Sequence, residues 1–397
     1  MKRIALAVIL LFSMHLYSRA EGIVFFHGTF AEAKAEAAKQ HKLIFMDCFT
    51  TWCGPCNRMS RDVFPRTDVG DFYNEHFICC KMDMEKGEGL DIAKSFVVRS
   101  YPTYLFLDAD GSLEHRTLGS KEPDLFIADG KIAIDPKQNL HGLTVRFTNG
   151  EKDTAMLIQL MSVASGVDNN LTEKVLAVYW GEVPESQIIE LHNWNVFSGY
   201  ENDLDSKAFR YVAANKKEFG DKYGAEAVDN TLCSKAAIEI RIAADTKDKD
   251  LFAKASAFVK PCKDKQTNVS AGLNSLRFYR KTGQWNEYVK YANAFLDKYG
   301  DNQEIYNSVA WEMVANTDDA IVLNEALNFI NKSMALDKNY GNSDTWANIL
   351  YKLKRYKEAE AAANESIALA KKEKLDYVST QELLDKIDKE LASRGGK

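Results

Sequence analysis

The chain has 397 residues, 46% of them hydrophobic and 27% charged, which is enough for two or three domains that each bury a core. Its formal net charge of -6 excludes the excess of Lys and Arg that a nucleic-acid-binding surface requires. We therefore expect a globular protein that does not bind nucleic acid.

Residues 1–20 have the pattern of a secretory signal peptide. Lys2 and Arg3 precede an apolar stretch that ends at Phe12, and small residues flank an expected cleavage site after Ala20. The stretch is too short to span a bilayer, although an uncleaved membrane anchor stays an alternative. There is neither a lipoprotein cysteine nor a lumenal retention signal. The pattern predicts that the chain is secreted to the periplasm of a Gram-negative bacterium. We expect the mature chain not to span the membrane.

Residues 21–135 alternate short strands with helices. Apolar runs between turn residues predict strands at 23–26, 43–49, 77–83, 103–108 and 113–118. Helical signals lie at 29–41, which opens with a capping box of Thr29 and Glu32, and at 55–64 and 90–96. This order, with a hairpin at its end, predicts an α/β domain with a mixed sheet and flanking helices.

Strand signals fade beyond about Asp135, and apolar residues there recur at helical spacing. We expect a helical domain over 136–270 and helical repeats over 271–397. The second region contains three similar segments: Trp285–Tyr288, Leu323–Ala326 and Tyr356–Ala359. Because their spacing is close to the roughly 34-residue period of tetratricopeptide repeats, the region resembles a degenerate array of that kind. An irregular all-α domain without true repeats is the alternative.

A pair of cysteines opens the helix predicted after the second strand. Cys53, preceded by Trp52, stands at the helix N-terminus, where unpaired backbone N–H groups and the positive end of the helix dipole stabilise a thiolate. It is the expected exposed nucleophile, and Cys56, one turn further in, is the expected resolving thiol. Gly54 permits close approach, and Pro55 fits the first helical turn because no N–H is needed there.

The run Trp52–Cys56 resembles the signature of the thioredoxin family, and the similarity extends through most of residues 22–132. The resemblance implies a thioredoxin fold. It also implies that Asp47 is a buried aspartate that assists proton transfer and that Lys81 is the lysine beside it.

Two further segments carry the resemblance. Tyr101, Pro102 and Thr103 match the loop that contains a cis-proline, lies against the redox pair and offers its backbone to a peptide. Leu118 and Gly119 match the turn that completes this substrate groove. We expect these residues to bind substrate, together with Trp52, Gly54 and Pro55 of the motif.

After the motif, the spacing to Val69 is most similar to the periplasmic reductase domain of DsbD and to related secreted thioredoxin-like proteins. At 49–51 the chain departs from classical thioredoxins, so a cytosolic-type thioredoxin reductase is not an expected partner. The resemblance implies a protein-disulfide reductase with a dithiol/disulfide cycle at Cys53 and Cys56, disulfide-containing protein clients, and a membrane electron donor of DsbD type. No cofactor or metal is expected.

Three other interpretations stay open. The pair could be half of a zinc site, although no second pair stands at ligand spacing. It could be a structural disulfide, although so short a loop gains little entropy from closure. In a different class, the chain could be a periplasmic scaffold or chaperone-like module whose thioredoxin domain is not essential.

The chain has 7 cysteines. Cys48, Cys79 and Cys80 fall in predicted strands and should be small buried hydrophobes. Strand alternation places Cys48 and Cys80 on the sheet face turned away from the redox pair. Cys233 and Cys262 lie in the helical region, and the sequence leaves open whether they are bridged.

Overall fold

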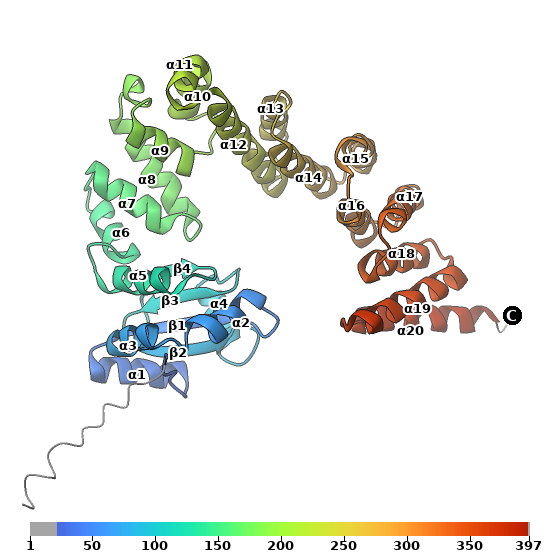
Figure 1. The fold of residues 1–397 in the computed structure, drawn as a ribbon, viewed down its shortest axis with the longest axis horizontal. Helices are drawn as coiled ribbons and strands as arrows, with labels where there is room; N and C mark the ends of the chain where they lie inside the picture. The colour runs from blue at the N-terminus through green and yellow to red at the C-terminus, as the bar shows by residue number, and fades with distance from the viewer. Residues whose placement is uncertain (1–21, 396–397) are drawn as a thin grey trace, which may run out of the picture. The chain divides into compact units, whose positions relative to one another are not determined.

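The computed structural model describes residues 22–395, so the predicted signal peptide lies outside the described residues. By its internal contacts the chain divides into two compact units, the first ending at Tyr200 and the second beginning at Glu201 (Figure 1). The domain boundaries drawn from the sequence stay predictions. None of the helices described is long and apolar enough to cross a membrane.

The first unit is built on a four-stranded sheet in the order β2-β1-β3-β4. Its strands are β1 (Leu43–Phe49), β2 (Phe77–Asp83), β3 (Thr103–Leu107) and β4 (Leu113–Leu118). β1 and β2 pair in parallel, whereas β1 with β3 and β3 with β4 pair antiparallel. The mixed sheet confirms the predicted fold class, and four of the five predicted strands are confirmed.

The strand predicted at 23–26 is wrong. Only Phe25 forms a bridge, to Cys79 of β2, because neighbouring backbone groups bond to other elements. The N–H of Ile23 donates to Phe64 (2.8 Å) and that of Val24 to the Asn74 side chain (2.8 Å). The segment therefore leaves the sheet after a single contact.

Helices cover both faces of the sheet. They are α1 (Phe30–Gln40), α2 (Gly54–Arg58) with its π-helical continuation η2 (Met59–Val63), α3 (Thr67–His76), α4 (Gly89–Ser95) and α5 (Pro123–Ile134). One core cluster joins α1 and α4 to Met46 and Leu105. The cluster of the opposite face joins η2, α3 and α5 to Phe45, where the stacked Tyr73 and Phe126 rings lie 4.4 Å apart.

Helix α3 was not predicted. Its N-cap, Arg66, makes no side-chain capping bond, so the usual start signal is missing. The helix also contains Gly70, which lowers helical propensity. That glycine is required by packing, because a Cβ there would lie 2.2 Å from the carbonyl oxygen of Gly22.

The rest of the described chain is helical, as the sequence predicted. The first unit continues with α6 (Leu140–Thr148), α7 (Thr154–Ala164), α8 (Asn169–Glu182), η3 (Glu185–Gln187) and α9 (Leu191–Tyr200). The second contains α10 (Lys207–Ala214), α11 (Lys216–Tyr223), α12 (Ala225–Thr246), α13 (Lys249–Val259), α14 (Lys265–Lys281), α15 (Trp285–Tyr299), α16 (Gln303–Asn316), α17 (Ala320–Leu336), α18 (Tyr340–Lys352), α19 (Tyr356–Glu373) and α20 (Val378–Gly395).

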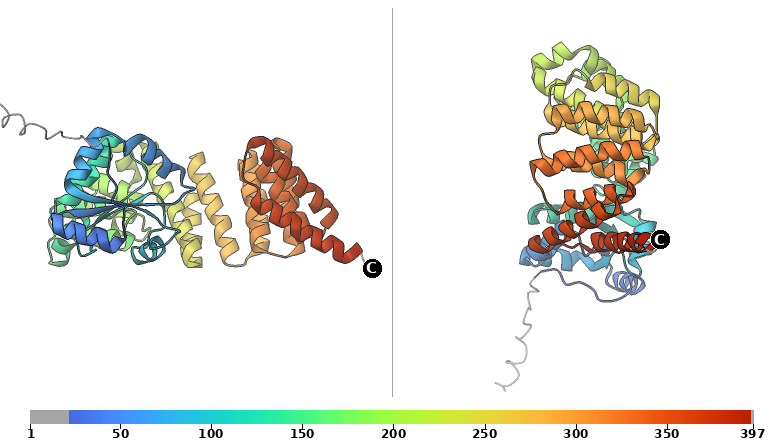
Figure 2. Two further views of the ribbon diagram at one scale, coloured as in Figure 1. Left: turned by 90° about the horizontal axis from the view of Figure 1, so that it is seen from below. Right: turned by 90° about the vertical axis from the view of Figure 1, so that its right-hand side faces the viewer.

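The three similar segments belong to α15, α17 and α19. Each of these helices packs on the helix before it, and Figure 2 shows α16 to α20, coloured orange to red, stacked in succession. The arrangement is consistent with repeat-like helices. The assignment to tetratricopeptide repeats stays a prediction.

Candidate functional site: a disulfide at a helix N-terminus

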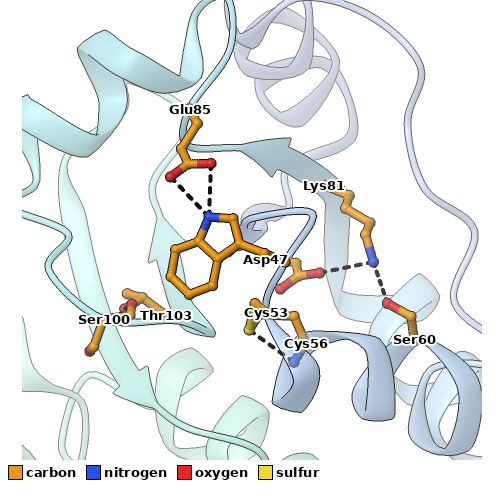
Figure 3. The surroundings of a disulfide bond; sticks show 9 residues. Asp47, Cys53, Cys56, Ser60, Lys81, Glu85, Ser100 and Thr103 are labelled. Atoms are coloured by element: carbon orange, nitrogen blue, oxygen red, sulfur yellow. Dashed lines mark hydrogen bonds and ion pairs between the residues drawn. A yellow bond between two sulfur atoms is a disulfide. The ribbon is translucent and has the colours of Figure 1, made fainter. Parts of the chain in front are cut away.

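Cys53 and Cys56 form a disulfide across the first turn of α2, with their Cα atoms 5.3 Å apart (Figure 3). Cys53 is the N-cap of α2, and its Sγ accepts a hydrogen bond of 3.1 Å from the N–H of Cys56. Helix geometry therefore brings the first sulfur to the unpaired backbone donors of the turn. Such donors stabilise a negative charge on that sulfur when the disulfide opens.

The prediction of an exposed Cys53 is wrong for this disulfide form. Cys53 is 3% exposed, whereas Trp52 is 68% exposed. The Cys53 sulfur is turned in toward Cys56 and the first turn of the helix, so the indole beside it makes most of the surface. Space for a substrate remains at Gly54, where an added Cβ would meet no atom within 4 Å.

Asp47 lies in the second half of β1 and is 1% exposed. Strand alternation puts it on the same face as Phe45, the face covered by η2, α3 and α5. Lys81 Nζ forms an ion pair with its Oδ2 at 3.3 Å, and no donor within residues 22–395 reaches either oxygen with hydrogen-bond geometry. Burial raises the pKa of Asp47 from 3.8 to about 6, although Lys81 acts in the opposite direction. The carboxyl can therefore hold or release a proton near neutral pH.

Lys81 connects this carboxyl to the helix that carries the cysteines. Its Nζ donates to Ser60 Oγ in η2 (Figure 3) and lies 4.8 Å and 5.3 Å from the ring centroids of Phe49 and Phe64. Ser60 was not a predicted site residue. It stands four residues after Cys56, so the only signal in the sequence is that both lie on one side of the helix.

The Tyr101–Pro102 peptide bond is cis, which confirms that prediction. The Pro102 carbonyl accepts a bond of 2.9 Å from the N–H of Gly119, whose φ of 82° favours glycine. Thr103 pairs with Leu118 in the β3–β4 ladder, and its hydroxyl donates to the Ser100 carbonyl at 2.7 Å. The structure thus brings the predicted groove residues together.

The groove also offers free backbone. In the described part of the chain no hydrogen bond engages the N–H or C=O of Tyr101. The Tyr101 ring meets the Trp52 ring edge to face, with centroids 5.9 Å apart, so the two predicted residues form one wall. An extended peptide can add its own hydrogen bonds at such an edge.

Glu85 is a second residue that the sequence analysis missed. Its carboxylate accepts the Nε1–H of Trp52 at 3.0 Å and 3.1 Å, fixing the exposed indole beside the cysteines. Glu85 follows β2 by two residues. Only the folded structure shows that this loop lies next to the redox motif.

The three free cysteines are buried, which confirms the prediction. Burial raises the pKa of Cys80 to about 11 and also raises the pKa values of Cys48 and Cys79. Cys48 and Cys80 pack with α1 and α4, on the face away from the redox pair as predicted. Cys233 and Cys262 form a second disulfide.

Comparison with known proteins places these observations in a family. The Thioredoxin-like family model matches residues 26–109. Thioredoxin H-type of Picea mariana is 34% identical over 109 residues, 27% of this chain and 82% of that protein. Thioredoxin-2 of Pyricularia oryzae is 35% identical over 97 residues, 24% of this chain.

Coverage of these relatives varies. The chain spans 53% of Thioredoxin-2 and 61% of Thioredoxin-1 of Drosophila melanogaster. Among solved structures, a proposed disulphide-isomerase from Bacteroides thetaiotaomicron is 43% identical, with 29% of this chain and 96% of that chain covered and a TM-score of 0.28. Through the domain that holds Cys53 and Cys56, the chain belongs to the thioredoxin-like family of disulfide oxidoreductases.

Proposed function

We propose that the chain is an exported protein-disulfide reductase. The observation that carries the proposal is the disulfide at the start of α2, which faces a cis-proline loop on one side and the Asp47 carboxyl on the other. A structural disulfide needs neither neighbour. Enzymatic turnover uses both, because one binds the substrate backbone and the other moves a proton.

The reaction begins with the reduced pair. The Cys53 thiolate attacks one sulfur of a client disulfide, that bond breaks, and the other client sulfur leaves as a thiolate that takes up a proton. Cys56, deprotonated, then attacks the Cys53 sulfur, the mixed disulfide breaks, and the second client sulfur leaves. Two electrons have moved from the pair to the client, and the pair is again the disulfide described above.

Asp47 is the proposed proton acceptor for Cys56. A carboxyl with a pKa of about 6 is largely ionised at neutral pH and can take the thiol proton during the second attack. Lys81 is a positioning residue, since it holds the carboxylate by charge and is itself held by Ser60.

The direction of exchange, the compartment and the partners belong to the same proposal. A Cys-Gly-Pro-Cys pair favours reduction, since thioredoxin lies near about -270 mV against about -120 mV for DsbA. The signal-like N-terminus supports the periplasm of a Gram-negative bacterium. There, a membrane protein of DsbD type would supply electrons, and the helices would select the disulfide-containing clients.

Insulin reduction by the purified protein tests the activity, and the equilibrium reduction potential of Cys53–Cys56 tests the direction. We expect turnover, and a potential closer to about -270 mV than to about -120 mV. A folded protein that binds clients but fails to reduce insulin would favour the scaffold interpretation instead. A potential at the DsbA end would replace the reductase by an oxidase.

A further inference from the structure

The second disulfide lies in the wall of a cavity. Cys233, in the middle of α12, is bonded to Cys262, in the loop between α13 and α14. Both cysteines line a cavity of about 910 Å³, large enough for a small molecule or a loop of another protein. Accessible disulfides exchange more readily than covered ones, so this position favours reactivity.

The cavity gives access to one sulfur more than to the other. Cys233 is 7% exposed, whereas Cys262 is partly exposed between the exposed Pro261 and Lys263. The cavity is lined by small side chains such as Ala213, Ala225 and Ala257 and by charged side chains of both signs, among them Lys216, Asp229, Lys263 and Lys265. A thiolate can therefore approach Cys262, and access is one of the factors that set the rate of exchange.

The loop around Cys262 is also held without the disulfide. The N–H of Cys262 donates to Val259 (2.9 Å), and its carbonyl accepts from the Asn268 side chain (2.9 Å). Asp264 caps α14 through the N–H of Thr267 at 2.6 Å. Opening the S–S bond therefore leaves both thiols near each other, ready to close again.

We propose that Cys233–Cys262 is a second exchangeable disulfide, which accepts electrons from a dithiol that enters the cavity. One donor thiolate attacks Cys262 Sγ, the S–S bond breaks, and Cys233 leaves as a thiolate and takes up a proton. The second donor thiolate attacks the donor's own mixed-disulfide sulfur, and Cys262 leaves in the same way. The donor is oxidised to a disulfide, and two electrons reach the helical region. This step does not depend on the proposed function of Cys53 and Cys56.

The test uses the full-length protein with Cys53→Ser and Cys56→Ser, treated with excess dithiothreitol under native conditions. Alkylation followed by peptide mass spectrometry reports Cys233 and Cys262 separately from the other cysteines. We expect the rate at which Cys233–Cys262 is reduced in the native protein to be at most about a hundredfold below the rate in guanidinium, where the disulfide is fully accessible. Slower reduction would overturn the proposal. The unmodified protein gives the same peptide-level readout if the double variant does not fold.

A matched pair of variants tests the route. Ala257 and Ala253 are both exposed and one turn apart on α13, but only Ala257 lines the cavity. Ala257→Trp should obstruct the opening and slow reduction roughly tenfold, whereas Ala253→Trp should leave the rate unchanged. Equal rates for the two variants would exclude the cavity as the path.

Discussion

Cys53–Cys56 spans a sequence separation of 3 within one helical turn, whereas Cys233–Cys262 joins a helix to a loop across a separation of 29. In the chain-entropy account, closing a loop of the second size stabilises the folded state by about 3.5 kcal/mol, and a much shorter loop contributes less. The same linkage makes the longer bridge harder to reduce. The first pair is suited to repeated turnover, and the second to a bond that opens only with a strong or abundant dithiol.

The surroundings of the two disulfides also make the first pair better suited to turnover than the second. Beside the first pair lie a buried carboxyl with a raised pKa and a free backbone edge. Around the second lie apolar side chains such as Ala257 and Phe258 together with charged ones, of which Lys216 and Asp229 pair with each other. A disulfide becomes an active site through the groups that move protons and hold substrate, while accessibility alone gives slower, uncatalysed exchange.

The largest effect is expected at the first pair. Cys53→Ser should lower insulin reduction by at least about a thousandfold, because no nucleophile remains. Cys56→Ser should keep the first attack and accumulate mixed disulfides with clients. The double variant Cys233→Ser/Cys262→Ser is the matched control and should retain full activity. If mild-acid alkylation of the reduced protein labels Cys56 before Cys53, the two roles are assigned wrongly.

The next effect is on stability. Cys233→Ser/Cys262→Ser should lower the free energy of local unfolding around α12 and α14 by about 3.5 kcal/mol, measured by hydrogen exchange of their amides. The reduced unmodified protein should match this variant, since both lack the same bond. A loss below about 1 kcal/mol would mean that the hydrogen bonds of Asn268 and Asp264 hold the loop with little help from the disulfide.

Asp47→Asn should slow turnover while raising stability at neutral pH. The folded pKa of about 6 exceeds the ordinary 3.8, so the folded state binds this proton more tightly and stability falls as pH rises from about 4 to about 6. Above that window the ionised carboxylate costs up to about 3 kcal/mol. The substitution removes this cost, so its gain should be small at pH 4 and largest at pH 7.

The exposed Asp62, paired with Arg61 on η2, provides the control for Asp47. Asp62→Asn should change neither turnover nor the pH dependence of urea unfolding appreciably. An equal gain in stability for Asp47→Asn at pH 4 and pH 7 would mean that the Asp47 carboxyl does not titrate between these pH values in the folded protein. That result would exclude its proposed role in proton transfer.

How far the sequence predicts this molecule depends on whether a signal is local. β1, β2 and β4 were predicted to the residue, because the strand signal of each has clear ends. Helix α3 was not predicted because its N-cap residue, Arg66, makes no side-chain capping hydrogen bond. The contacts of Ser60 and Glu85 join parts of the chain 21 and 33 residues apart. Such contacts, like the bridge in the helical region, depend on how elements pack and leave no pattern in the sequence.

The smallest effect concerns α1, which lies on the sheet face away from the redox pair. Thr29 caps this helix in a capping box with Glu32. Thr29→Ala removes the acceptor for a backbone N–H and should lower the stability of the sheet domain by about 1 kcal/mol. Thr29→Ser keeps the hydroxyl and is the control.

Because α1 contacts neither cysteine of the first pair, insulin reduction by Thr29→Ala should equal that of the unmodified protein at temperatures where both are folded. Hydrogen exchange should show the loss of protection in the first turn of α1 and little change in α2. A drop in turnover without a drop in stability would contradict this, since it would mean that the two faces of the sheet are coupled through β1 and that the redox pair depends on packing well beyond its own helix.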